Sequence, residues 1–248
     1  MAGSIQISEE VGVRQLHFGS RWIQGAMRIA RPFALELEYT RDMMLPLLLR
    51  AQPRWPRHVL LIGLGAASLV KFLHRHRPQA TLTVVEIAPE VVTAAWQFFK
   101  LPDDARRLAI EIGDGADYVM TSDRQFDLIL VDGYDAKGRT GMLDTLPFYC
   151  NARARLSDTG VLATNLLSRS RGVAPSLARA REAFDGRARA FPPCASGNTI
   201  VLAATGEPID VAPDEFGVLA RRLKVETALN LLPALARWRE AGGGRFEL

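Results

Sequence analysis

Residues 59–76 read VLLIGLGAASLVKFLHRH. The apolar start of this stretch predicts a buried strand, which runs directly into the glycine-rich turn Gly63-Leu64-Gly65 and then into a helical pattern over 69–76. Glycine lets a backbone turn sharply and approach a ligand closely, and the helix that follows offers unpaired amide groups. The same turn also serves as a plain strand-to-helix connection, and its third small residue is Ser68 rather than glycine.

Strand-like apolar runs alternate with helical patterns after this stretch. This alternation is typical of a parallel sheet wrapped by helices, so the fold class that we predict is α/β with a Rossmann-like, mostly parallel sheet. Seven strands are predicted, at 59–62, 82–86, 109–112, 126–131, 161–165, 188–191 and 199–203. Turn residues at 192–197 separate the last two strands and predict an antiparallel hairpin there.

Shorter patterns flank the predicted sheet. Apolar and polar residues alternate over 5–29, with turn signals at Gly12 and Gly19, which predicts a small antiparallel β segment. We therefore divide the chain into an N-terminal β segment at 1–31 and a Rossmann-like domain at 32–248.

Two helical segments are predicted outside the sheet. Residues 35–50 carry apolar side chains at a helical spacing, but Pro46 removes a backbone donor and predicts a kink or an early end. Residues 214–240 predict a helical tail with a break at Pro233, and we expect the glycines at 242–244 to fray.

Composition argues against several classes of protein. The 248 residues carry a formal charge of +4, and arginine is spread along the chain, so no nucleic-acid partner is expected. Cys150 and Cys194 form no CxxC pair, which gives no sign of a disulfide framework or a metal site. The sequence has neither a leader pattern nor a run of about 18 apolar residues, so we expect a cytoplasmic protein with no membrane partner. Hydrolase elbows and Walker loops are also absent.

Acidic residues follow the second and third predicted strands. Glu86 ends the second strand about 20 residues after the glycine turn, where a carboxylate can hold both ribose hydroxyls of a nucleoside. Gly113-Asp114-Gly115 ends the third strand and places a second carboxylate where an adenine amino group can donate to it. Together these acids indicate a nucleoside ligand. An NAD dehydrogenase fits poorly, because no catalytic histidine or Tyr-Lys set is evident.

Two further carboxylates, Asp132 and Asp135, follow the fourth strand. Ligands of open α/β sheets bind at the carboxyl ends of the strands. Asp132 is therefore placed to accept a hydrogen bond, or a proton, from an attacking amine. The structural alternatives are that Asp135 only caps the following turn and that Asp132 only supports its strand end.

Residues 59–165 resemble the spermidine synthase family, whose members transfer an aminopropyl group from decarboxylated S-adenosylmethionine to a diamine. The likeness rests on the runs Leu61-Ile62-Gly63-Leu64-Gly65, Val85-Glu86-Ile87 and Gly113-Asp114-Gly115, the pair Asp132 and Asp135, and the late turn Ser196-Gly197-Asn198. The N-terminal β segment and Tyr39 are similar to the family's N-terminal hairpins and to the tyrosine near its amine site.

The resemblance implies the fold of S-adenosylmethionine-dependent methyltransferases and a role for each matched residue. The donor, decarboxylated or intact S-adenosylmethionine, would contact Gly63, Gly65, Glu86, Ile87, Asp114, Gly115 and Asp132. Asp132 would be the general base, Asp135 would hold the second ammonium of a small-molecule amine, and Tyr39 would also bind this substrate. Methylthioadenosine would be released, no metal is implied, and family members are commonly homo-oligomers, so a homodimer is expected.

Three departures from the family keep other functions open. The family's aspartate in the glycine turn is Ala66 here, the proline after the second aspartate is Ala136, and the late tyrosine is Cys194. Because Ala66 permits the carboxylate of intact S-adenosylmethionine, a methyltransferase is the first alternative. A catalytically silent nucleoside- or polyamine-binding protein is the second. Gln24 is not counted among the site residues, because a contact with the donor is the less favoured interpretation of this position.

Overall fold

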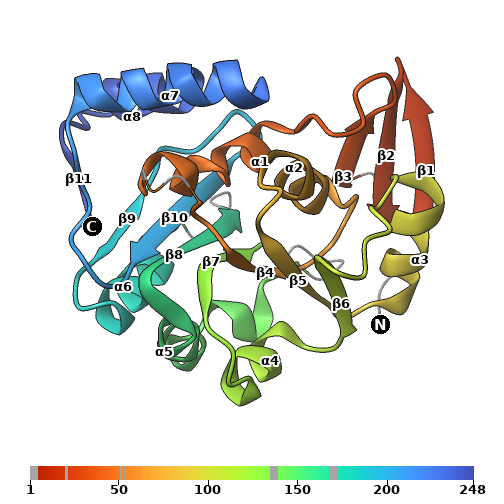
Figure 1. Cartoon of the computed structure of the whole chain (residues 1–248), viewed down its shortest axis with the longest axis horizontal. Helices are drawn as coiled ribbons and strands as arrows, with labels where there is room; N and C mark the ends of the chain where they lie inside the picture. The colour runs from red at the N-terminus through yellow and green to blue at the C-terminus, as the bar shows by residue number, and fades with distance from the viewer. Residues whose placement is uncertain (1–4, 20–21, 51, 53, 135–138, 168–171) are drawn as a thin grey trace.

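The computed structural model describes residues 5–19, 22–50, 52, 54–134, 139–167 and 172–248. A large sheet with helices on both faces forms its body, as Figure 1 shows. A small three-stranded sheet lies at one end of the molecule, and the last two helices lie at the other end. Within the described residues, no helix is long and apolar enough to span a membrane.

The large sheet has seven strands in the order β6-β5-β4-β7-β8-β10-β9. Its strands are β4 (His58–Ile62), β5 (Thr81–Glu86), β6 (Leu108–Ile112), β7 (Phe126–Val131), β8 (Leu156–Leu167), β9 (Ala188–Ala190) and β10 (Asn198–Ala204). The first five of these strands pair in parallel, whereas β10 is antiparallel to both of its neighbours. The predicted fold class and the final hairpin are therefore confirmed.

The strand order reverses between β4 and β7. The chain runs outward from β4 through β5 to β6 and then returns to the other side of β4 to form β7. In sheets of this kind the ligand binds outside the carboxyl ends of the strands at such a reversal. The residues that follow β4 and β7 are the glycine turn and Asp132.

Helices cover the two faces of the large sheet in separate layers. One apolar core holds side chains from a 3₁₀ turn, α2, α3, α7 and α8, and the other holds side chains from α4, α5 and α6. The bounds are α2 (Ser68–His76), α3 (Pro89–Phe98), α4 (Gly115–Thr121), α5 (Leu146–Ala154), α6 (Ala174–Ala183), α7 (Pro213–Thr227) and α8 (Leu232–Glu240). Residues 59–62 of β4 are all buried because the strand is covered on both faces, as expected of a parallel sheet.

The N-terminal β segment forms an antiparallel sheet of β1 (Ile5–Glu10), β2 (Val13–Phe18) and β3 (Ile23–Arg28). Val11 and Gly12 both have positive φ, at 48° and 73°, which suits the two-residue turn between β1 and β2. This sheet rests on the glycine turn, because a Cβ on Gly25 would lie 2.6 Å from the Cβ of Ala66. The division of the chain after residue 31 stays a prediction.

The helix predicted over 35–50 is wrong in extent. The structure has a short helix α1 (Glu38–Asp42) and a separate 3₁₀ turn η1 (Leu45–Leu48). Pro46 lies at the start of the 3₁₀ turn, because a proline inside a continuous helix would lack a donor and crowd the carbonyl of Asp42.

Two expectations for the C-terminal tail also need correction. The tail breaks earlier than predicted, at Ala228 with φ 61°, and Pro233 lies in the first turn of α8, where proline is favoured. The glycines at 242–244 do not fray, because the chain continues into β12 (Phe246–Glu247), which pairs with β11 (Asp210–Val211). Phe246 is fully buried and anchors this end.

Candidate functional site

The glycine turn and Asp132 meet at the reversal of the sheet. The amide of Asp132 donates to the carbonyl of Ile62 at 2.9 Å, which joins the carboxyl ends of β4 and β7. Gly63 has a φ of 92°, and a Cβ there would lie 2.4 Å from the carbonyl oxygen of Asp132. Only glycine fits this position, so the first glycine of the motif is required by the backbone whether or not a ligand binds.

Two side chains hold the carboxylate of Asp132. Asn165 Nδ2 donates to Oδ1 at 2.8 Å, and the Tyr39 hydroxyl donates to Oδ2 at 3.2 Å. Burial raises the pKa of Asp132, and these two hydrogen bonds oppose that rise because they favour the charged form. A carboxylate with a raised pKa is a stronger base, so the group is suited to accept a proton.

The phenol of Tyr39 acts as a donor in this pair. Burial raises the pKa of Tyr39 well above its usual value, and the charge of Asp132 raises it further. The hydroxyl therefore keeps its proton at neutral pH and points it at the carboxylate. The sequence placed Tyr39 near an amine site, and the structure brings it to Asp132 from a helix 93 positions earlier in the chain.

A chain of polar side chains fixes Asn165 from behind. Asn198 Nδ2 donates to Asn165 Oδ1 at 2.9 Å, and Ser196 Oγ donates to Asn198 Oδ1 at 2.7 Å. Ser196 Oγ also lies 3.0 Å from Cys194 Sγ. The Tyr134 hydroxyl donates to the backbone carbonyl of Asn165 at 2.5 Å. The amide of Asn165 is thereby turned so that its nitrogen faces Asp132.

Neither Asn165 nor Asn198 was predicted as a site residue. A usable signal was present, because Asn165 is a buried amide near the carboxyl end of β8, next to the strand that delivers Asp132. The antiparallel register pairs Asn198 with Leu167, which brings its side chain within reach of Asn165. That register could not be read from the sequence.

Glu86 lies at the end of β5 and is 7% exposed. Its Oε2 accepts from the amide of Leu64 at 2.8 Å and its Oε1 from the amide of Ala88 at 3.0 Å. Burial raises the pKa of Glu86, and the backbone donors oppose the rise. The carboxylate therefore supports the glycine turn, and it retains lone pairs for further donors. Ile87, beside it, is exposed.

Asp114 caps the helix that follows β6. Its Oδ1 accepts from the amide of Ala116 at 2.7 Å, at the first turn of α4. Gly115 is required by packing, since a Cβ there would lie 2.2 Å from Ile62 Cγ2. A capping role thus explains an aspartate at this position without any ligand, and the adenine contact predicted for Asp114 stays a prediction.

The glycine turn, Asp132 and Tyr39 line one hollow. It is lined by Gln24, Gly25, Tyr39, Thr40, Gly63, Leu64, Gly65, Ala66, Ser68, Leu69, Val70 and Asp132. Gln24, which was not predicted as a site residue, lies beside the glycine turn. Glu86, Ile87 and Asp114 are not among these lining residues and lie at the neighbouring strand ends of β5 and β6. Asp135, the second predicted carboxylate, lies outside the described residues.

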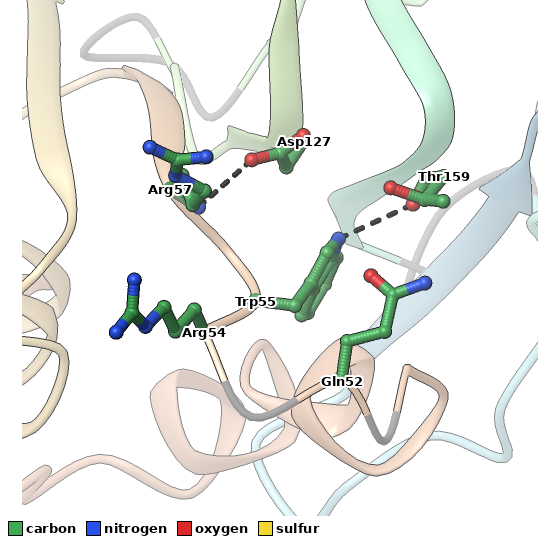
Figure 2. Close-up of a pocket in the computed structure, with 6 residues that line it drawn as sticks. All are labelled: Gln52, Arg54, Trp55, Arg57, Asp127 and Thr159. Atoms are coloured by element: carbon green, nitrogen blue, oxygen red, sulfur yellow. Dashed lines mark hydrogen bonds between the residues drawn. The ribbon is translucent and has the colours of Figure 1, made fainter.

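A larger hollow, of about 380 Å³, opens at the opposite edge of the sheet, where β4 and β7 begin (Figure 2). Its carboxylate, Asp127, accepts from the amides of Arg57 and His58 through Oδ2 and from Ser157 Oγ through Oδ1. Trp55 Nε1 donates to the carbonyl of Thr159 at 3.2 Å. Because Asp127 already holds the start of β4 to β7 and β8, we do not place the reactive site there. Among the residues that the structure describes, no three His, Cys, Asp or Glu side chains gather as a metal site requires.

Comparison with known proteins identifies what this chain is similar to. The family model of the spermine/spermidine synthase domain matches residues 37–168. A polyamine aminopropyltransferase from Chromobacterium violaceum is 37% identical over 204 residues, which cover 82% of this chain and 77% of the relative.

Solved structures share the fold. A probable spermidine synthase from Corynebacterium glutamicum superimposes with a TM-score of 0.74 at 20% identity, over 89% of this chain and 83% of that chain. The human methyltransferase-like protein 13, in complex with SAH, gives a TM-score of 0.68 at 23% identity, over 77% of this chain and 93% of that chain. Proteins named for two different chemistries thus share this sheet, and the fold alone does not separate them.

Proposed function

The chain belongs to the spermine/spermidine synthase family and is an enzyme that transfers aminopropyl groups, and we propose that Asp132 is the base that takes the proton of the attacking amine. One observation carries this proposal. The carboxylate of Asp132 lies at the strand reversal, beside the glycine turn, and is oriented by Tyr39 on one oxygen and Asn165 on the other.

The proposed donor is decarboxylated S-adenosylmethionine, and the glycine turn fits its nucleoside. A Cβ on Gly63 would meet the backbone of Asp132, and Gly65 has a φ of 50°, so this turn leaves the backbone open beside the hollow. Glu86 and Asp114 place carboxylates at the next two strand ends for ribose hydroxyls and an adenine amino group. The SAH held by the human methyltransferase-like protein is a related nucleoside, which supports a ligand of this class.

Asp132 acts on the amine. The donor supplies a methylene carbon made electrophilic by an adjacent sulfonium, which is a good leaving group. Asp132 takes one proton from the amine as the nitrogen forms its bond to that carbon and the carbon–sulfur bond breaks with both electrons going to sulfur. Methylthioadenosine and the aminopropylated amine are then the products.

The chain's own residues supply placement and a tuned base. The raised pKa of Asp132 brings its basicity closer to neutral pH, where general-base catalysis is efficient. Tyr39 and Asn165 keep both oxygens in one orientation, so little rearrangement is needed when the amine arrives. We assign Tyr39 to the amine side of the hollow, and by family resemblance Asp135 to the second ammonium of the amine.

Three further assignments carry over from the sequence: the location and the N-terminal division from its patterns, and the oligomeric state from the family resemblance. We propose that the protein works in the cytoplasm, that it forms a homodimer, and that residues 1–31 act as a separate β segment beside the catalytic domain. Size-exclusion chromatography with light scattering tests the dimer. A mass of one chain, 27.3 kDa, would reject it.

The test of the function combines binding and turnover. Calorimetric titration with methylthioadenosine, decarboxylated S-adenosylmethionine and intact S-adenosylmethionine measures the affinity for the shared nucleoside. It also shows whether the protein prefers the decarboxylated or the intact tail of the donor. Turnover is followed with the decarboxylated donor and 1,4-diaminobutane. Preference for the intact donor would contradict the proposed co-substrate.

Asp132→Asn separates binding of the nucleoside from turnover. The variant should bind methylthioadenosine with wild-type affinity and lose at least about a hundredfold in kcat, the range of a general base. Asp185→Asn, at an exposed ion pair with Arg153, is the matched control and should leave kcat unchanged. A variant that turns over at the wild-type rate would reject Asp132 as the base.

A further inference from the structure

The helix that carries Tyr39 depends on contacts from elsewhere in the chain. α1 has five residues, and its N-cap position, Leu37, makes no side-chain cap. A helix of this length is not stable by itself, because the cost of its first turn is not recovered by propagation. The position of Tyr39 against Asp132 is therefore set by what holds α1 in place.

Arg237, on the C-terminal helix α8, holds α1 at two points. Its Nη1 donates to Glu38 Oε1 at 2.5 Å, and its Nη2 donates to Asp42 Oδ2. Glu38 and Asp42 are four positions apart and so lie on the same side of the helix. The two carboxylates bracket Tyr39 in the sequence, and one guanidinium clamps both of them.

The same contact reaches the turn behind the acceptor side. Glu38 Oε2 accepts from the amide of Ala195 at 3.0 Å. Ala195 lies between Cys194 and Ser196, which begins the polar chain through Asn198 to Asn165. Arg237 thus connects, through Glu38, to the second donor of Asp132 as well as to the first.

We infer that Arg237 is a positioning residue for the transfer reaction, which fixes the tyrosine helix and the 194–197 turn and so sets the geometry of the amine side. This inference rests on the proposed function. The residue lies outside the stretch 37–168 that the family model matches, on a helix remote from the glycine turn.

Charge and burial explain why α1 needs the two hydrogen bonds from Arg237. Asp42 is 5% exposed, and burial raises its pKa to about 6, which the guanidinium of Arg237 opposes. The charge of Glu38 acts in the other direction and raises the pKa of Asp42. Without Arg237, both hydrogen bonds that hold α1 to α8 are lost, and of the two cations that oppose the rise in the pKa of Asp42 only Arg41 remains. The helix would then shift, and Tyr39 with it.

The experiment compares Arg237→Gln with Arg237→Lys and with the control Arg239→Gln. Arg239 lies on the same helix, is exposed and donates to the carbonyl of Pro213, remote from α1. The measurements are the affinity for methylthioadenosine, the affinity for 1,4-diaminobutane in the presence of methylthioadenosine, and kcat/KM for the amine. The ¹³C resonance of the Tyr39 ring, assigned with Tyr39→Phe, reports the hydrogen bond without any turnover.

Arg237→Gln should bind methylthioadenosine within twofold of the wild type and lose at least tenfold in affinity and kcat/KM for the amine. Its Tyr39 resonance should move toward that of an exposed tyrosine. Arg237→Lys has one ammonium, which can hold one of the two carboxylates. It should keep the fold, and its amine affinity and kcat/KM should lie between those of the wild type and of Arg237→Gln. Arg239→Gln should match the wild type.

Two results would overturn the inference. One is an unmoved Tyr39 resonance in both Arg237 variants. The other is an equal loss of nucleoside and amine affinity, which would mark a general loss of structure. If the wild type itself fails to bind or convert the amine, the proposed function fails, and the Tyr39 resonance still decides whether Arg237 positions the tyrosine.

Discussion

Asn165→Leu should raise the pKa of Asp132 and move the pH at which the enzyme works. Asn165 Nδ2 donates to Asp132 Oδ1 at 2.8 Å, and this bond lowers a pKa that burial raises. Leucine has a similar volume and cannot donate. A hydrogen bond to a charged group contributes about 1.5–3 kcal/mol, and one pKa unit corresponds to about 1.4 kcal/mol, so the pKa should rise by roughly one to two units.

The assay is the pH dependence of kcat/KM for 1,4-diaminobutane. A base acts only in its deprotonated form, so activity is lost as the pH falls through the pKa of Asp132. Raising that pKa moves the acidic limb of the profile to higher pH by the same one to two units. Activity should fall most at pH values below the new pKa, and the variant should approach the wild type once the pH exceeds it.

Asn198→Leu is the control. It removes the donor at 2.9 Å that orients Asn165 through Oδ1, but it keeps the Asn165 amide, which can still donate to Asp132. Its acidic limb should move by less than about half a unit, even if the free energy of unfolding falls as much as in Asn165→Leu. An unmoved limb in Asn165→Leu, or an equal shift in both variants, would refute the reasoning.

Three other predictions follow from positions with a single dominant contact. Gly63→Ala should lower the free energy of unfolding by about 2 kcal/mol or more, measured by urea denaturation, because its Cβ would lie 2.4 Å from the carbonyl of Asp132 at a φ of 92°. Burial lowers the pKa of Lys71 to about 7, so stability should rise with pH between about 7 and 10, by up to about 1.4 kcal/mol per unit. Lys71→Met should flatten that slope in a pH series of melting curves. Asp114→Ser keeps an N-cap but shortens the side chain, so it should spare the melting temperature and weaken methylthioadenosine binding if the carboxylate also holds adenine.

The positions of the residues proposed for the nucleoside could be predicted, because these residues follow their strands directly. The glycine turn follows β4, Glu86 ends β5 and Asp114 follows β6, so the parallel order of the sheet alone brings them to one edge. Even here the sequence did not reveal that Gly63 is required by the backbone of Asp132. Nor did it show that Asp114 caps α4.

On the proposed amine side, the family resemblance named Asp132 and Tyr39, but the contacts that orient them could not be predicted, because these join distant segments. Tyr39 reaches Asp132 from a helix that Pro46 limits and that Arg237 holds from 199 positions away along the chain. Asn198 reaches Asn165 through the register of the antiparallel pair β8 and β10. Periodicity predicts elements, but it does not predict which side chains of separate elements meet.

This division bears on how one fold serves two reactions. The carboxylates proposed for the nucleoside, Glu86 and Asp114, would serve any donor built on adenosine, and a protein named as a methyltransferase shares the fold with a TM-score of 0.68. They therefore cannot decide which group is transferred. In this chain we assign the choice of reaction to the residues around Asp132. Tyr39 and Asn165 orient its basic carboxylate, which lines the hollow. A change in reaction should thus require changes in α1, β8 and β10 as well as in the glycine turn, where Ala66 bears on the choice between intact and decarboxylated donor.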